Sequence, residues 1–262
     1  MDYTITPTIQ ELERLACKAG EILRRGYGKD HRISYKSAID LVTEVDRESE
    51  DYLLKEILQR YPHHQVMAEE SGLKEGESSC RWYIDPLDGT VNYAHGIPIF
   101  AVAIAFSERN ELRLGVVYDP MRDECFSAEK GKGARLNGES IHVSDAAALS
   151  NALLVTGFPY DIQTNQQNNL NHYIKFSMVS QGVRRLGSAA LDLCYVACGR
   201  FDGYWEIRLN AWDIAAGGLI AAEAGATVTN IQGEGKYLRT PFSILAANPA
   251  IHEQMMGVLG EK

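Results

Sequence analysis

The stretch Trp82-Tyr83-Ile84-Asp85-Pro86-Leu87-Asp88-Gly89-Thr90 decides the fold prediction. Three apolar residues run straight into two aspartates, so the segment predicts a strand with acids at its end. Pro86 fixes its own φ and biases Asp85 toward extended backbone, which lets both carboxylates and the Leu87 carbonyl face one small volume. Hard oxygen ligands in that arrangement suit Mg²⁺. Taken alone, the segment could equally be a turn, because Asp-Pro and Asp-Gly are common turn dipeptides.

The next two residues, Gly89 and Thr90, have the chemistry of an anion pocket. Gly89 permits close backbone approach, and the N–H groups of Gly89 and Thr90 would precede a short helix. A phosphate group could then bridge a metal ion and the backbone. The segment therefore predicts a site for a phosphorylated small molecule.

Three further segments carry acids at element boundaries. Glu69 and Glu70 follow an apolar strand-like run, and Asp213 starts an Ala/Gly-rich helix. Lys36 and Asp46 delimit a segment just before another expected helix. Each segment also has a structural alternative: a solvated loop for the Glu-Glu pair, and a helix cap for each aspartate.

The composition excludes several classes of protein. The 262 residues carry a net charge of -9 and no Lys/Arg-rich block, which argues against nucleic-acid and membrane-surface partners. Residues 1–30 contain no apolar stretch resembling a signal peptide or the ~20-residue span of a membrane helix, so a cytoplasmic location is expected. The five cysteines show no zinc or disulfide pattern and are expected to be reduced thiols.

Hydrophobic periodicity predicts mixed layers of helix and sheet. Two amphipathic helices are expected at residues 9–23 and 46–61, a β-meander at 99–106, 112–118 and 125–128, and surface loops at 131–138 and 163–171. Beyond these, strands are expected at 152–157, 203–207 and 243–246, and helices at 188–197 and 214–224. The chain is expected to form one compact unit with two halves. Residues 1–145 would carry most of the metal ligands, and residues 146–262 would carry Asp213 and the residues that select the substrate, such as Glu206.

Taken in order, these segments resemble the inositol monophosphatase family of metal-dependent phosphatases. The pairing of Asp-Pro-Leu-Asp-Gly-Thr at 85–90 with Trp-Asp-Ile-Ala-Ala-Gly at 212–217 is specific, and matches extend from residue 40 to residue 226. The resemblance implies an α/β fold layered αβαβα, as in inositol monophosphatase and fructose-1,6-bisphosphatase. It also implies an active site between the two halves, a homodimer, and inhibition by millimolar lithium.

The same resemblance implies roles for individual residues. Glu69, Asp85 and the Leu87 carbonyl would hold one Mg²⁺, and Asp85, Asp88 and Asp213 a second. Glu69 would share a third ion, which makes two to three in all, with Mn²⁺ as a substitute. The metal-activated water would be positioned by Thr90, itself oriented by Asp46, with Glu70 nearby. The residues implied in substrate binding are Lys36, Glu69, Leu87, Asp88, Gly89, Thr90, Ala189, Glu206 and Asp213.

Residues that flank the metal motif point to the substrate. Asn92 and Tyr93 resemble the Asn-aromatic pattern of inositol and sugar-phosphate enzymes. Glu206 matches a carboxylate that accepts hydrogen bonds from ring hydroxyls, which predicts inositol 1-phosphate as substrate. The alternatives are fructose 1,6-bisphosphate, alone or in addition, then 3′-phosphoadenosine 5′-phosphate, and finally a non-catalytic regulator that binds phosphorylated ligands or another protein.

Overall fold

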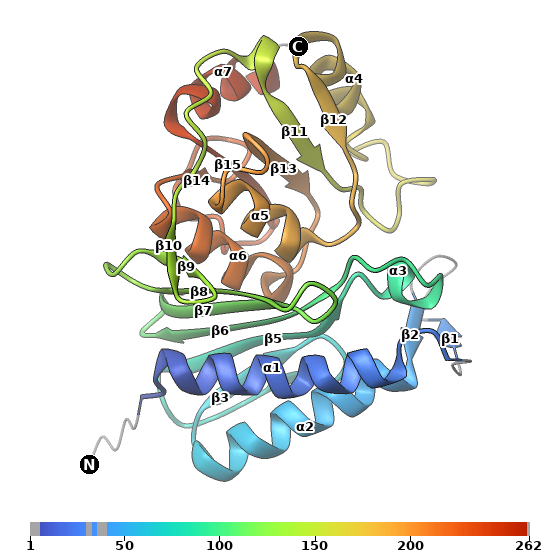
Figure 1. Ribbon diagram of the computed structural model, residues 1–262, viewed down its shortest axis with the longest axis vertical. Helices are drawn as coiled ribbons and strands as arrows, with labels where there is room; N and C mark the ends of the chain where they lie inside the picture. The colour runs from blue at the N-terminus through green and yellow to red at the C-terminus, as the bar shows by residue number, and fades with distance from the viewer. Residues whose placement is uncertain (1–5, 30–32, 36–40, 261–262) are drawn as a thin grey trace.

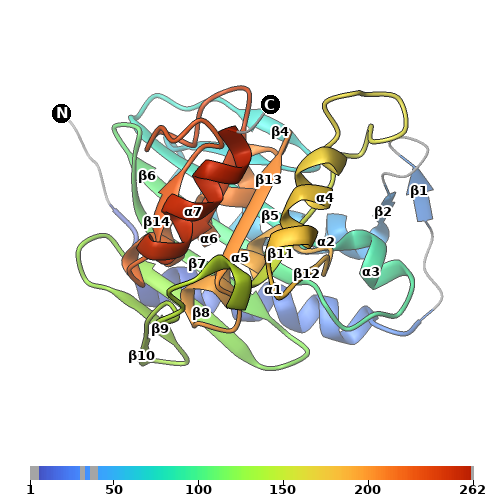
Figure 2. The ribbon, with the colours of Figure 1, turned by 90° about the horizontal axis from the view of Figure 1, so that it is seen from above.

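The computed structural model describes residues 6–29, 33–35 and 41–260, and it stacks helices and sheets in alternating layers (Figure 1). Helices α1 and α2 cover the outer face of a large sheet, and α5 and α6 separate that sheet from a smaller one. Seen from above, α4 and α7 cover the far face of the small sheet (Figure 2). The predicted αβαβα arrangement is therefore confirmed. The α-helices are α1 (Ile9–Gly26), α2 (Glu44–Arg60), α3 (Thr90–Ala94), α4 (Leu170–Val179), α5 (Ala189–Ala197), α6 (Ala211–Glu223) and α7 (Pro249–Gly260).

The large sheet has eight strands in the order β10-β9-β8-β7-β6-β5-β3-β4. Its neighbours are antiparallel except for β3 and β5, which run parallel, so the ends of these two strands meet at one edge. The predicted meander is confirmed as β6, β7 and β8. The strands are β3 (Gln65–Ala68), β4 (Gly72–Lys74), β5 (Cys80–Asp88), β6 (Ala101–Glu108), β7 (Glu111–Asp119), β8 (Glu124–Glu129), β9 (Ala134–Leu136) and β10 (Glu139–Ile141).

The small sheet has five strands in the order β12-β11-β13-β15-β14. Strand β11 runs parallel to both of its neighbours, whereas the β13, β15 and β14 pairs are antiparallel. The strands are β11 (Leu153–Thr156), β12 (Gly182–Arg184), β13 (Gly203–Ile207), β14 (Thr227–Thr229) and β15 (Ser243–Ala247). A separate two-stranded ribbon pairs β1 (Ile33–Tyr35) with β2 (Leu41–Thr43), and a 3₁₀ turn, η1 (Leu149–Asn151), precedes β11.

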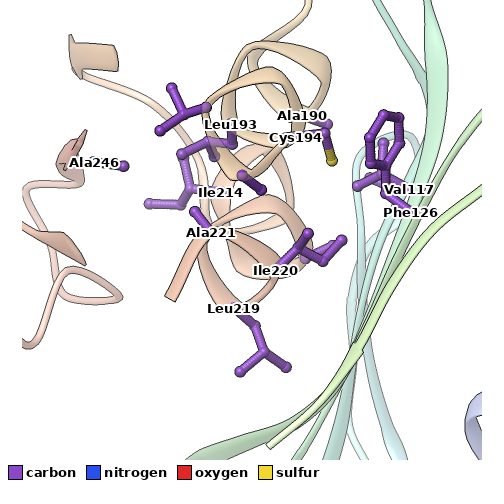
Figure 3. Packing of buried hydrophobic residues seen from close by; sticks show 14 of the residues in the cluster. Val117, Phe126, Ala190, Leu193, Cys194, Ile214, Leu219, Ile220, Ala221 and Ala246 are labelled. Carbon is purple, nitrogen blue, oxygen red and sulfur yellow. The ribbon is translucent and has the colours of Figure 1, made fainter. Parts of the chain in front are cut away.

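The central core joins the two sheets through α5 and α6. Figure 3 shows Leu193 of α5 and Ile214 and Ile220 of α6 lying between Val117 of the large sheet and Ala246 of the small one. All five side chains are fully buried. Since burial of an aliphatic side chain contributes roughly 1.5–3 kcal/mol, this shared apolar layer holds the two halves together.

Sequence expectations for the helices are confirmed, with shifted ends. Helix α2 begins at Glu44, two residues before the expected Asp46, because the Thr43 side chain accepts a hydrogen bond from the Val45 N–H and forms the cap. Helix α6 begins at Ala211 for a similar reason, since Asn210 is its N-cap. Asp213 is thus the third residue of the helix, where its carboxylate accepts from the Asn210 N–H and completes the capping box.

One loop expectation is wrong, and another is confirmed with a shifted end. Residues 131–138 contain β9 and the turn to β10, a hairpin whose strands have only three residues each, too few for alternation to be visible. The expected loop at 163–171 ends earlier, because α4 begins at Leu170 after Asn169. Within the described ranges no helix is long and apolar enough to cross a membrane. All five cysteines are free thiols, as expected.

Candidate active site

A bulge at the end of β5 brings its two aspartates to the same side of the strand. Residues three apart on a regular strand point to opposite faces. Here Asp85 pairs with Ala103 and Asp88 with Ala101, so β5 has one residue more than β6 in this interval. The extra residue restores a common direction for the two carboxylates. The motif is therefore part of the strand, not the turn that its dipeptides also allowed.

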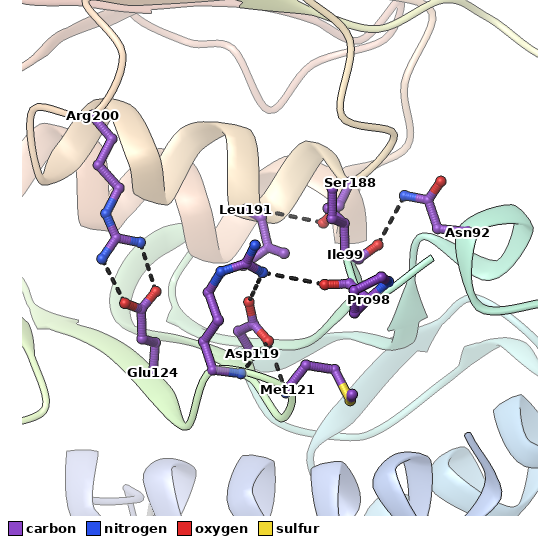
Figure 4. Close-up of polar contacts among 10 residues, drawn as sticks. Asn92, Pro98, Ile99, Asp119, Met121, Glu124, Ser188, Leu191 and Arg200 are labelled. Atoms are coloured by element: carbon purple, nitrogen blue, oxygen red, sulfur yellow. Dashed lines mark hydrogen bonds and ion pairs between the residues drawn. The ribbon is translucent and has the colours of Figure 1, made fainter. Parts of the chain in front are cut away.

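Gly89 and Thr90 follow directly. Gly89 has a φ of 98°, and a Cβ there would come within 2.9 Å of the Ile99 carbonyl oxygen, so the backbone needs glycine at this position. Asn92 fixes the loop from the other side: its Nδ2 donates to the carbonyls of Ile99 and Leu186, each at 2.8 Å. Figure 4 shows the first of these two bonds.

The Thr90 hydroxyl and the Asp46 carboxylate are joined by a hydrogen bond. Thr90 Oγ1 lies 3.1 Å from Asp46 Oδ1 and 3.0 Å from the Leu87 carbonyl oxygen. The other Asp46 oxygen accepts from the Thr43 N–H at 2.9 Å and so completes the capping box of α2. Burial raises the pKa of Asp46, and the hydrogen bonds from Thr43 and Thr90 oppose that rise. Asp46 therefore both caps a helix and orients the threonine.

Asp88 joins the two halves of the molecule. Its Oδ2 accepts from Ser188 Oγ at 2.6 Å and from the Ala190 N–H at 2.7 Å, which places the carboxylate at the start of α5. Beyond the other end of α5, Arg200 makes two hydrogen bonds to Glu124 of β8 (Figure 4). Helix α5 is thus tied to the large sheet near both ends.

Between the halves lies a cavity of about 110 Å³. Nearly all the residues predicted for the metal and substrate sites line it: Glu69, Asp85, Leu87, Asp88, Gly89, Thr90, Ala189, Glu206 and Asp213. Asp46 stands behind Thr90, outside the lining. Glu70 is also outside it, and its backbone N–H donates to Glu50. Lys36 lies outside the described residues, so its predicted role stays a prediction.

The carboxylates of this cavity repel one another. Burial first, and then the charges of Glu69, Asp88 and Asp213, raise the pKa of Asp85 well above its ordinary value. Burial raises the pKa of Asp88 to about 6 and that of Asp213 well above its ordinary range. Such a cluster is unfavourable when ionised unless a cation compensates it.

Comparison of the chain with known protein families shows to which family it belongs. The model of the inositol monophosphatase family matches residues 5–261. The chain belongs to the inositol monophosphatase family. Its site is accordingly that of a phosphatase of this family's type.

Individual relatives agree with the family match. A protein named Nus factor SuhB from Pasteurella multocida is 41% identical, over 96% of this chain and 95% of its own length. Phosphatase IMPL1, chloroplastic, from Arabidopsis thaliana is 41% identical over 97% of this chain and 70% of its own. The solved inositol monophosphatase of Anabaena (Nostoc) sp. PCC 7120 has a TM-score of 0.87 and 40% identity, covering 96% of this chain and 94% of that one.

The family's phosphatases generally depend on Mg²⁺, and the chemistry of the donors fits that ion, since carboxylate and carbonyl oxygens are its preferred protein ligands. Over residues 6–29, 33–35 and 41–260, however, no three Asp, Glu, His or Cys side chains are grouped closely enough to ligate one ion. Hydrogen bonds to the starts of α5 and α6 hold Asp88 and Asp213 instead. The donor set therefore fits a Mg²⁺ site whose side chains must still converge.

Two charged lining residues, Arg185 and Asp192, were missed by sequence reasoning. Asp192 had a usable signal: it stands alone among apolar residues in the helix Ala-Ala-Leu-Asp-Leu-Cys-Tyr-Val-Ala, where a charge is expensive to bury. Arg185 had none, since it is one of two adjacent arginines in an irregular polar segment.

Proposed function

We propose that this protein hydrolyses a small phosphate monoester with Mg²⁺, and that inositol 1-phosphate is the substrate. The observation that carries the proposal is that Glu69, Asp85, Asp88 and Asp213, from both halves of the molecule, line one cavity. Four carboxylates alone would repel a phosphate, so they are useful to such a substrate only when cations neutralise them.

In this proposal Glu69, Asp85 and the Leu87 carbonyl hold one ion, and Asp85, Asp88 and Asp213 hold another. When bound, the ions would compensate the charge of the phosphate and lower the pKa of a water molecule. Gly89 lacks a side chain and so leaves room for the phosphate beside the start of α3.

Proton handling falls to Thr90 and Asp46. Thr90 Oγ1 lies 3.1 Å from Asp46 Oδ1, so it can pass its own proton to Asp46 as it accepts one from a water molecule in the cavity. The water oxygen would then form a bond to phosphorus, while the ester oxygen leaves with its electron pair and takes up a proton from solvent. Glu70 has no assigned step, because it lies outside the cavity lining.

Substrate choice rests on the small sheet. Glu206 of β13 is buried and lines the cavity, and the Tyr204 hydroxyl donates to its Oε2 at 2.6 Å. Burial raises the pKa of Glu206 to about 7. A buried acceptor fixed in this way favours substrates with hydroxyl groups over those without. Ala189, on the neighbouring wall, is small enough to leave space for a ring.

The test is release of inorganic phosphate from three esters, each with and without Mg²⁺: inositol 1-phosphate, fructose 1,6-bisphosphate and 3′-phosphoadenosine 5′-phosphate. Mg²⁺-dependent preference for the first supports the proposal. Preference for either of the others keeps the metal chemistry and replaces the substrate. The same assay with Mn²⁺ measures whether that ion substitutes.

One finding favours a second candidate, a regulator that acts through another protein. The Pasteurella multocida relative bears the name Nus factor. If no ester releases phosphate in a Mg²⁺-dependent way, this non-catalytic role replaces the enzymatic one. Retention of all the predicted metal acids in the cavity argues for the enzyme.

We also propose a homodimer. Helix α4 lies on the outer face of the molecule (Figure 2). Its residues Leu170, Ile174 and Met178 are exposed at intervals of four and form an apolar stripe. A second copy of the chain would cover it. Sedimentation equilibrium should give twice the chain mass of 29.1 kDa, and a Met178→Glu variant should shift the mass toward the single chain.

A further inference from the structure

Asp192 is a buried acid that the proposed mechanism does not use. It lies on α5, its side chain is 1% exposed, and it lines the cavity. Among the described residues its Oδ1 has no hydrogen-bond partner. A buried acceptor without a hydrogen bond lowers the free energy of unfolding by about 1–3 kcal/mol. Asp192 therefore destabilises the fold unless another group bonds to it.

The start of α5 does not need this carboxylate. Ser188 Oγ accepts from the Leu191 N–H at 3.3 Å and forms the N-cap, while Asp88 accepts from the Ala190 N–H. The Asp192 N–H donates to the Ser188 carbonyl. The free amides at the start of the helix are therefore satisfied by Ser188 and Asp88, and Asp192 is not a capping residue.

Three charged residues that line the cavity, Glu206, Asp88 and Arg185, affect the pKa of Asp192. Glu206 and Asp88 raise the pKa of Asp192, after burial, and Arg185 opposes them. All three line the same cavity. Asp192 of α5 and Glu206 of β13 are thus a pair of carboxylates on the wall of one cavity, which Arg185 also lines.

Glu206 is held firmly enough to form one side of such a pair. The Tyr204 hydroxyl fixes its Oε2, and Gly157 provides the space, since a Cβ there would overlap both carboxylate oxygens. The carboxylate lies against bare backbone on one side. Asp192, by contrast, has a buried oxygen, Oδ1, without a hydrogen-bond partner in the described part of the chain.

We infer that Asp192 is a specificity residue: its carboxylate accepts a hydrogen bond from a second hydroxyl of the substrate, beside the hydroxyl that Glu206 accepts. This inference rests on the proposed function. The ligand class is a polyol monophosphate with two hydroxyls on its ring or chain that reach both carboxylates. The same pair disfavours a second phosphate at this place, because two carboxylates there face only one guanidinium.

The experiment uses the full chain with Mg²⁺ and two variants of Asp192. Asp192→Asn keeps the shape and an acceptor oxygen but loses the charge, whereas Asp192→Leu loses both. Three substrates report separately: inositol 1-phosphate, fructose 1,6-bisphosphate, and p-nitrophenyl phosphate, whose leaving group has no aliphatic hydroxyl.

We expect Asp192→Leu to lower kcat/KM for inositol 1-phosphate about tenfold through KM, the factor that corresponds to about 1.4 kcal/mol. Asp192→Asn should restore most of that loss. Both variants should raise the turnover of fructose 1,6-bisphosphate relative to wild type, because both remove the charge. Turnover of p-nitrophenyl phosphate should stay within about twofold, a change of less than ~0.5 kcal/mol.

Two results would overturn the inference. If Asp192→Leu lowers turnover of inositol 1-phosphate and p-nitrophenyl phosphate alike, or leaves both unchanged, Asp192 does not recognise hydroxyls. Should Asp192→Leu fail to fold, as judged by thermal melting, Asp192→Ala, which also lacks the acceptor, replaces it and is compared with wild type on a deoxy analogue of inositol 1-phosphate. If removal of the substrate hydroxyl lowers affinity equally in Asp192→Ala and in wild type, the inference is contradicted. Failure of the proposed function is distinguishable, because wild-type protein would then release no phosphate from any ester.

Discussion

The acids of the two sheets are held in different ways. In the large sheet, a bulge in β5 aims Asp85 and Asp88 in one direction, so the backbone fixes their spacing. On the other side, Glu206 of β13 depends on side-chain support from Tyr204 and on the bare backbone of Gly157. We therefore expect the acids of the large sheet to serve metal binding and Glu206 to serve recognition of substrate hydroxyls. Changes in the large sheet should affect every ester, and changes around Glu206 should affect only substrates with hydroxyls.

Asp88→Asn should have the largest effect. The variant keeps an oxygen that can accept from Ser188 and Ala190 but loses the negative charge that a metal ion requires. Removal of one such electrostatic group costs about 10²–10³ in turnover. We expect that loss for inositol 1-phosphate and for p-nitrophenyl phosphate alike, measured as phosphate or nitrophenol release across a Mg²⁺ titration.

A matched control checks that the fold survives. Circular dichroism and the melting temperature of Asp88→Asn without Mg²⁺ should equal or exceed those of wild type, because a repelling buried charge is removed. Normal turnover in the variant would mean that the assignment of the metal site is wrong.

Gly157→Ala should have a smaller and more selective effect. The new Cβ would overlap Glu206 Oε1 and Oε2, so the carboxylate must move away from Tyr204. We expect kcat/KM for inositol 1-phosphate to fall about tenfold, a loss of roughly 1.4 kcal/mol of binding, with p-nitrophenyl phosphate almost unaffected. Steady-state kinetics on both substrates test this.

Gly235→Ala is the control, because a Cβ at Gly235 has nothing within 4 Å. It should leave both reactions unchanged. If Gly157→Ala loses kcat/KM equally for both substrates, the proposal that the two sheets have different roles is contradicted.

The pH dependence of stability should differ in sign between Glu206 and His64. Glu206 has a pKa raised from 4.5 to about 7 by burial, so the folded state binds its proton more tightly than the unfolded state. Its contribution is fully present below pH 4.5 and is lost as the pH rises through about 7. Without Mg²⁺, wild type should lose on the order of 3 kcal/mol relative to Glu206→Gln between pH 5 and 8. Urea unfolding at each pH measures the difference.

His64, on the far side of the large sheet, gives the smallest effect and the opposite sign. Burial lowers its pKa below 6.5, and its Nδ1 accepts a hydrogen bond from Trp82 Nε1 at 3.1 Å. Its contribution is present above pH 6.5 and is lost as the pH falls through the lowered value. Acidification from pH 7 to 5 should lower the melting temperature of wild type relative to His64→Leu. A parallel pH profile for the two proteins would contradict this.

The sequence predicted the large half better than the small one, for physical reasons. The 82–90 motif combines an apolar strand, a proline and a glycine, each with a local conformational effect, so the acids at 85 and 88 could be placed without tertiary information. The bulge could not, because it depends on pairing with β6. Helix α4 was missed because its apolar residues Ile174 and Met178 are exposed, so its periodicity does not follow burial.

Site prediction shows the same contrast. Asp85, Asp88 and Glu69 come from segments that lie side by side in the sheet, and Asp213 from a recognisable helix start. Asp192 and Arg185 enter the cavity only because α5 packs across the large sheet, a long-range contact that no local pattern encodes. Thr90 and Asp46, 44 residues apart, are joined by a hydrogen bond that likewise depends on tertiary packing.

The bonds from Ser188 and Ala190 to Asp88 have a thermodynamic consequence. A cation that draws Asp88 toward itself also pulls on the start of α5, and α5 carries Asp192 one turn farther along. Binding of the proposed metal ion and binding of the proposed polyol would then affect one another. By reciprocity, whatever factor Mg²⁺ adds to the affinity for the hydroxyl-bearing ligand, that ligand adds to the affinity for Mg²⁺.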